Sequence, residues 1–442
     1  MSNLIIMILI STTLYFLSKA VSQRGIGILS FIILFWSIQI IFSYIGTLGG
    51  YEWDYKGIIW LYIMMLFLIG SWYVGKKLTL KVNAVDQSEG QYSYYSISNV
   101  GWELLNILIV LGIIKWIYEI AINGFHLSDF FSLSSLANMN NSFAVARYSN
   151  GADQNAITQI LNIAVYAAPL IGGFALPFSE RKKQKWSCII SILPALLVTL
   201  TVNTKATLIG AVILYVAGFI TAYYLKNKEG IRVKPKTVFI VVIAIIGFAF
   251  LMVLSMMLRI GEISGHTFSI VMRKLVVYMF GNVQTFDVWM SNYWNDSSFT
   301  NGGMTFLGIS NSLGFMTRVQ GVYTSLQGTS SNVYTAFRGV IQDYGTVGGI
   351  IFTSIIGFIS GLSEGIVLNT NRIKAIPCFV MASTFFFFVY GFIISPWTYL
   401  SYIFAVIVFG IWINITKRNS VILVFNKKPL FNSDYVSKKE LI

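Results

Sequence analysis

Residues 332–349, NVYTAFRGVIQDYGTVGG, bring several polar side chains together directly before an apolar run that begins near Gly345. If Asn332 caps a helix, Tyr334 and Arg338 lie one turn apart on one face of it. The glycine then ends that helix before the apolar run starts. An arginine held in this way can bind phosphate oxygens through two parallel N–H groups. The segment therefore predicts a site for a phosphorylated group at the edge of a membrane span.

Three other basic residues fall on the same side of the predicted topology as Arg338. Lys205, in TVNTKATLIG, lies in a turn that is too short to leave the membrane surface. Its ammonium group either reaches the lipid headgroups or binds an anion, and the sequence leaves both interpretations open. Arg147 and Arg318 lie in long loops, where an arginine is either solvated or part of a site.

A cavity with several cations suits a diphosphate, because guanidinium groups match phosphate oxygens in geometry as well as in charge. A structural salt bridge between Arg338 and a loop carboxylate is the alternative. The predicted diphosphate site is formed by Arg147, Lys205, Arg318 and Arg338, with Tyr334 and Asn203 as polar lining.

The elements that position these residues are predicted to be membrane-spanning helices. Of the 442 residues, 56% are hydrophobic and only 11% are charged, and apolar runs of about 18 or more residues recur along the chain. This pattern predicts an all-α polytopic membrane protein in which residues 1–442 form a single integral membrane domain. Eleven spans are predicted, at residues 3–18, 26–48, 57–75, 99–121, 156–178, 187–202, 206–225, 237–258, 345–366, 376–394 and 398–415.

The basic residues predict the orientation of these spans. Most of the 31 Lys and Arg fall in the connections on one side and in the C-terminal tail, which indicates that this side is cytoplasmic. The first span has no basic residue before it, and Lys19 follows it, so we expect the N-terminus outside and the C-terminus in the cytoplasm. The long connections at residues 122–155 and 259–344 then lie outside, and the second is expected to contain short amphipathic helices.

The composition argues against several classes of function. Two Cys and two His cannot build a Cys or His metal cage, and we expect neither a metal nor a cofactor. The net charge of +14 fits the positive-inside rule, so no nucleic-acid partner is expected. Residues 70–77, GSWYVGKK, nearly match a phosphate loop, but they follow no strand and have Lys77 where a Ser or Thr belongs. ATP-driven chemistry is therefore not expected.

The chain resembles the Wzy class of bacterial O-antigen and capsule repeat-unit polymerases. The resemblance lies in the segment 332–349, the large outer loop before it, the turn NTKAT and the eleven-helix layout. The chain differs from the common pattern in having Lys205 where an arginine is frequent. The resemblance implies a multi-pass protein of the bacterial inner (cytoplasmic) membrane. It implies a metal-independent glycosyl transfer between undecaprenyl-pyrophosphate-linked repeat units at the outer face, with membrane lipid and a chain-length-determining co-polymerase as partners.

Such a transfer needs stabilisation of the diphosphate leaving group, which the cations can supply, and an acceptor for the hydroxyl proton. The candidates on the outer side are His266, Asp287 and Asp343. Histidine titrates near neutral pH, whereas a carboxylate beside arginines is a weaker base. We predict His266 as the base and Asp343 as the group that orients Arg338, with Asp287 as the next candidate base.

Two other functions stay open at this stage. A transporter or lipid-linked oligosaccharide flippase would use charged residues within spans, such as Lys115 and Glu119, which lie one turn apart. No paired Gly- or Pro-broken spans in matching halves accompany them, and the unexpected charge is concentrated on one face. An O-antigen ligase or another polyprenyl-phosphate-dependent glycosyltransferase would differ from a polymerase mainly in its acceptor.

Overall fold

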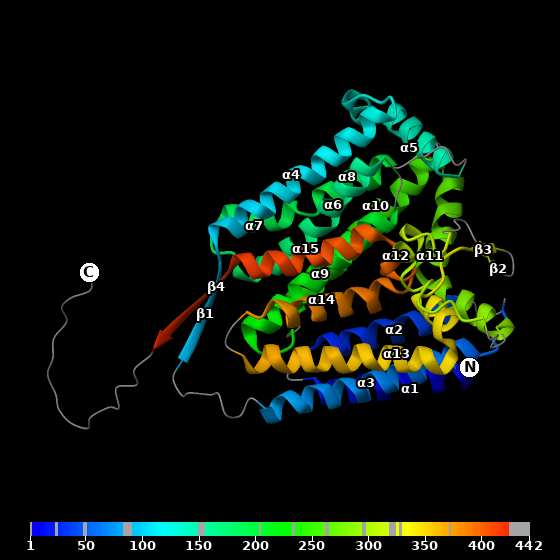
Figure 1. Cartoon of the computed structure of the whole chain (residues 1–442). Coiled ribbons are helices and arrows are strands. Elements are labelled where there is room, and N and C mark those ends of the chain that lie inside the picture. Colours follow the sequence, from blue (N-terminus) through cyan, green and yellow to red (C-terminus); the bar gives the residue numbers. More distant parts are fainter. Residues whose placement is uncertain are drawn as a thin grey trace, which may run out of the picture.

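The computed structural model describes residues 2–22, 25–46, 51–82, 91–148, 155–202, 205–231, 235–260, 265–293, 298–317, 324–326, 329–370 and 373–423. Most of these residues are helical. This is the expected fold class for a membrane protein, because lipid offers no hydrogen-bond partner to an unpaired backbone group. The long helices run side by side in one bundle (Figure 1).

Each predicted span coincides with a helix. The helices are α1 (Ser2–Val21), α2 (Ile28–Gly46), α3 (Lys56–Val82), α4 (Asn99–Ile122), α6 (Ala156–Ala175), α7 (Lys182–Ile190) with α8 (Leu193–Val202), α9 (Lys205–Asn227), α10 (Pro235–Ile260), α13 (Ala336–Asn369), α14 (Ala375–Tyr390) and α15 (Leu400–Thr416). Among the described residues, eight helical segments are long and apolar enough to cross a membrane, whereas the apolar parts of α10, α14 and α15 are shorter. A multi-pass membrane protein is supported, and the number eleven stays a prediction.

The remaining elements gather at the two ends of the bundle. Strands β1 (Gln91–Ile97) and β4 (Lys417–Leu423) pair antiparallel at the end away from the N-terminus (Figure 1). The other end, which we call the loop end, carries α5 (Leu133–Tyr148), α11 (Gly265–Asn292), α12 (Leu307–Ser312) and the hairpin of β2 (Thr324–Leu326) and β3 (Thr329–Ser331). Short 3₁₀ turns precede α5 (η2, Leu127–Phe131), follow α6 (η3, Leu176–Phe178) and precede α15 (η4, Pro396–Thr398). Among the described parts of residues 259–344, the prediction of short helices holds for α12 and for the stretch of α13 before Gly345, whereas α11 has 28 residues.

Helices α3 and α13 pack closely because small residues line their contact. A β-carbon added to Gly361 would lie 2.1 Å from the carbonyl oxygen of Trp72. Close packing through small residues is a main attraction between helices in lipid. On each of the two helices, small residues recur at every fourth position, which places them on one helix face. They are Ser71, Gly75 and Thr79 on α3 and Gly357, Gly361 and Gly365 on α13.

Gly361→Ala is expected to lower the free energy of unfolding by about 1–3 kcal/mol, because the new methyl group overpacks the contact with α3. Thermal unfolding of the purified protein in detergent measures this effect. The matched control is Gly70→Ala in α3, where an added β-carbon meets nothing within 4 Å. The control should be neutral or slightly stabilising, since alanine is the better helix former. Equal effects of the two substitutions would contradict the packing described above.

Helix α13 is kinked at Gly345, where φ is 76° and ψ is 176°. Only glycine adopts this backbone conformation readily. The prediction that this glycine ends the first helical stretch is therefore confirmed. The predicted cap at Asn332 is wrong, because the chain stays extended as far as Thr335, which occupies the N-cap position. Residues 336–344 thus form a short helical segment at the loop end of α13.

A buried ion pair joins α3 and α13 near the end opposite the loop end. Lys76 Nζ donates to Glu364 Oε1 at 2.9 Å, and Trp72 Nε1 donates to the other oxygen of the same carboxylate. Lys76 also donates to the carbonyl oxygen of Val21 at the end of α1. The pair is almost fully buried, and its hydrogen bonds hold three helices together.

Candidate functional site

Arg338 lies between aromatic side chains at the loop end. Its guanidinium carbon is 4.0 Å from the ring centre of Tyr334 and 5.5 Å from that of Trp289 in α11. Tyr334 and Arg338 are therefore close together, but not on one helix face as predicted, because Tyr334 precedes the helix. No described carboxylate lies within 4.0 Å of the guanidinium group, so the alternative of a salt bridge is not met in the described part of the chain. Aromatic contacts hold the cation in place and leave its N–H groups available to an anion.

Lys205, the first residue of α9, also contacts an aromatic ring of α11. Its Nζ atom lies 5.4 Å from the ring centre of Tyr278. Tyr278 and Trp289 are 11 residues apart, which is about three helical turns and about 16 Å along the axis. Their side chains therefore lie on the same face of α11. We call this the cation face of α11, because both Lys205 and Arg338 are held against it.

The structure does not describe the side chains of the other predicted members Arg147, Arg318 and Asn203. Arg318 and Asn203 belong to the ranges 318–323 and 203–204, which the structure does not describe. The backbone of Arg147 is part of α5, but its side chain is not described. Of the four predicted cations, the structure brings two to one helix face.

Asp343 is buried and binds a loop. Its carboxylate accepts hydrogen bonds from the backbone N–H groups of Met304 at 2.9 Å and Thr305 at 2.6 Å, and from the hydroxyl of Thr300. The prediction that Asp343 orients Arg338 by direct contact is wrong for this reason. The carboxylate instead fixes the turn before α12 on the first segment of α13.

Asp287 is fully buried and caps α3 from a neighbouring helix. Its Oδ1 atom accepts from the backbone N–H of Gly57 at 2.9 Å, and its Oδ2 atom accepts from those of Asp54 at 3.1 Å and Tyr55 at 3.3 Å. Burial raises the pKa of the Asp287 carboxyl, and the three backbone N–H groups act in the opposite direction. A carboxylate at a helix N-terminus satisfies amides that have no partner within the helix. The geometry thus gives Asp287 a structural role.

Asp287→Asn is expected to lower the free energy of unfolding by about 1–3 kcal/mol, because one amide N–H₂ group would face a backbone N–H. Activity and thermal stability should fall together, and stability is measured by thermal unfolding. Asp54→Asn, at an exposed side chain paired with Lys56, is the control and should change stability little. If Asp287→Asn lost activity at unchanged stability, Asp287 would act in the chemistry instead.

His266 does not lie beside Arg338. It is exposed and is the second residue of α11, 23 residues before Trp289. That separation is about 35 Å of helix. Because Arg338 is held against Trp289, the prediction that His266 is the base next to this arginine is not supported by its position.

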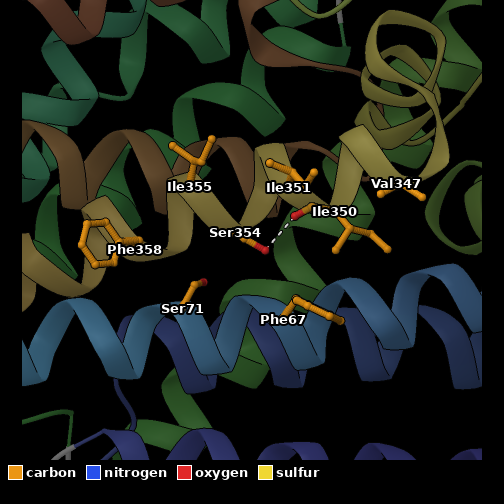
Figure 2. A pocket seen from close by; sticks show the side chains of 8 residues that line it. All are labelled: Phe67, Ser71, Val347, Ile350, Ile351, Ser354, Ile355 and Phe358. Atoms are coloured by element: carbon orange, nitrogen blue, oxygen red, sulfur yellow. Dashed lines mark hydrogen bonds between the residues drawn. The ribbon is translucent and has the colours of Figure 1, made fainter.

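An apolar groove lies between α3 and α13. Its volume is about 520 Å³, and Figure 2 shows its lining side chains on the two helices. Most of these side chains are hydrophobic, and several are more than half exposed. The groove therefore suits a hydrocarbon chain rather than an anion. Its lining consists of Phe67, Ser71, Val347, Ile350, Ile351, Ser354, Ile355 and Phe358.

Sequence reasoning missed the aromatic residues that hold the cations. Tyr278 and Trp289 belong to a stretch in which Arg273 and Lys274 interrupt the apolar pattern, so the helix gives no span signal. The spacing of 11 residues indicates that Tyr278 and Trp289 share a helix face. That spacing points to a site only when the positions of Lys205 and Arg338 are known.

In comparisons with known proteins, no family model, no curated protein and no solved structure matches the chain.

Proposed function

We propose that the chain is a polymerase of lipid-linked oligosaccharide repeat units, with a diphosphate-binding site on the cation face of α11. The observation that supports this most is the position of Arg338, a cation held by two aromatic rings without a described carboxylate partner. Arg338 is only half-buried at the loop end, so its guanidinium group can reach an anion from outside the chain. A polyprenyl diphosphate is an anion that the membrane itself delivers.

The loop end faces outward in this proposal. Many of the described basic residues lie at the opposite end, including Lys77 at the end of α3, Lys182 at the start of α7 and Lys226 at the end of α9. Positively charged connections stay in the cytoplasm. The N-terminus and the cation face then lie outside, and the C-terminus lies inside.

The reaction transfers a glycan from its diphosphate carrier to a sugar hydroxyl. The bond between the anomeric carbon and the diphosphate oxygen breaks, and a bond from the acceptor oxygen to that carbon forms. Arg338 and Lys205 stabilise the negative charge that develops on the leaving diphosphate. The acceptor proton passes to a diphosphate oxygen, because the buried carboxylates of Asp287 and Asp343 already accept several hydrogen bonds each.

Ion-coupled transport finds less support in the charged residues within the helices. Lys115 and Glu119 form a buried ion pair within α4, and Lys76 pairs with Glu364. Oppositely charged side chains that pair with each other in this way mainly hold the helices together.

Deletion of the gene in its source organism tests the proposal and separates it from its alternatives. A polymerase predicts loss of long surface glycan and accumulation of single lipid-linked repeat units on the outer face. A ligase predicts accumulation of long polymer on the lipid carrier, and a flippase predicts repeat units retained on the cytoplasmic face. Unchanged surface glycan and unchanged lipid-linked intermediates would contradict all three functions.

A further inference from the structure

A buried amide lies on the cation face of α11 between the two cation contacts. Asn282 is four residues after Tyr278 and seven before Trp289, spacings that place all three side chains on one helix face. Its side chain is 0% exposed. Among the residues that the structure describes, neither its amide nitrogen nor its amide oxygen has a hydrogen-bond partner. A buried amide without partners is destabilising, and such groups are rare in native proteins.

A second polar group of this kind lies near Arg338 in the sequence. Thr335 is next in sequence to Tyr334, the ring that Arg338 contacts most closely. Its hydroxyl is buried and has no hydrogen-bond partner in the described part of the chain.

The N–H₂ group and the carbonyl oxygen of the Asn282 amide define the chemistry of a matching ligand. The N–H₂ group needs an acceptor, and the carbonyl oxygen needs a donor. The oxygens of a diphosphate at neutral pH accept hydrogen bonds and offer almost no donor. A sugar hydroxyl both donates and accepts, so neighbouring hydroxyls on one ring can form hydrogen bonds with both groups of the amide.

We propose that Asn282 binds hydroxyl groups of the glycan next to the diphosphate and so selects the lipid-linked sugar over the bare carrier. This inference rests on the proposed function and adds a sugar-recognising residue to its site. Because neighbouring side chains cover Asn282, the ligand reaches it only when they move. Tyr278 at one end of the cation face is 36% exposed, which makes it the natural point of entry. Asn282 acts here as a specificity residue rather than a catalytic one.

The test compares two ligands on one variant. Purified wild type and Asn282→Leu in nanodiscs are titrated with undecaprenyl diphosphate and, separately, with undecaprenyl-diphosphate-linked repeat unit extracted from the deletion strain. We expect the variant to bind the repeat unit about 10-fold more weakly, while its affinity for the bare carrier changes less than about 2-fold. The melting temperature should stay equal or rise, because leucine removes an unsatisfied polar group of similar size.

The control is Asn292→Leu in the same helix, whose exposed amide already donates to the carbonyl oxygen of Val288. It should change neither affinity. Unchanged affinity of Asn282→Leu for the repeat unit would overturn the inference alone, and so would an equal loss for both ligands. A lower melting temperature of this variant would show a structural partner for the amide and would also overturn it. If wild type binds the bare carrier no better than Arg338→Ala does, the proposed function fails as well.

Discussion

Arg338→Ala is expected to lower the rate of polymer formation by about 10²–10³-fold, the usual loss when one group that stabilises transition-state charge is removed. The guanidinium group is held by Tyr334 and Trp289, so it is already oriented before a diphosphate arrives. No described carboxylate pairs with it at ion-pair distance, and its removal therefore leaves no described carboxylate without its partner. The variant should fold and insert normally. Polymer length and yield in a complemented deletion strain measure the effect, with membrane content of the protein measured in parallel.

Arg338→Lys separates charge from geometry at this position. A lysine keeps the positive charge but loses the planar contact with the two rings and the two-pronged contact with phosphate oxygens. Intermediate activity is the expected result. Wild-type polymer from Arg338→Ala at normal protein level would show that this cation has no role in the reaction.

Glu364→Ala should produce the largest loss of stability, about 3–5 kcal/mol, because it leaves the Lys76 ammonium buried without its carboxylate. The side chains of both residues are almost fully buried, and the indole N–H of Trp72 shares the same carboxylate. Loss of the carboxylate therefore affects α1, α3 and α13 together. Thermal unfolding in detergent, or the yield of folded protein, gives the measurement.

The double variant Lys76→Met with Glu364→Leu is the informative control. Removing both charges should recover at least half of the lost stability, since apolar residues of similar size often replace a buried pair without large cost. Lys56→Ala removes an exposed pair, with side chains 58% and 43% exposed, and should cost less than about 1 kcal/mol. If Glu364→Ala were as mild as Lys56→Ala, the buried pair would not hold these helices together.

The sequence predicts the helices and the kink of α13 because these depend on neighbouring residues. An apolar run of sufficient length specifies a span wherever it lies in the chain. Gly345 is the residue type that a backbone with φ of 76° needs, and its position between Asp343 and the apolar run was enough to place the break. Lys205 and Arg338 could be singled out for a similar reason, since a cation at a span boundary on the predicted outer side is unusual.

The partners of the acidic residues could not be predicted, because they come from distant parts of the chain. Asp343 binds the backbone of Met304 and Thr305, and Asp287 binds the start of α3 more than two hundred residues earlier. Their residue type suggested a candidate base for Asp287 and an orienting group for Asp343, whereas their tertiary contacts are with backbone N–H groups. His266 was chosen because histidine titrates near neutral pH, but a continuous helix carries it away from Arg338. The orphan amide of Asn282 is visible only once its surroundings are known.

The most direct test is polymerisation by the purified chain in liposomes that contain undecaprenyl-diphosphate-linked repeat units from the deletion strain. The products are separated by size after release from the lipid. The predicted result is a ladder of polymers from wild type, accompanied by free undecaprenyl diphosphate, with only single repeat units from Arg338→Ala. Unchanged single repeat units with folded wild-type protein, or an equal ladder from both proteins, would contradict the assignment of the cation face as the site of glycan polymerisation.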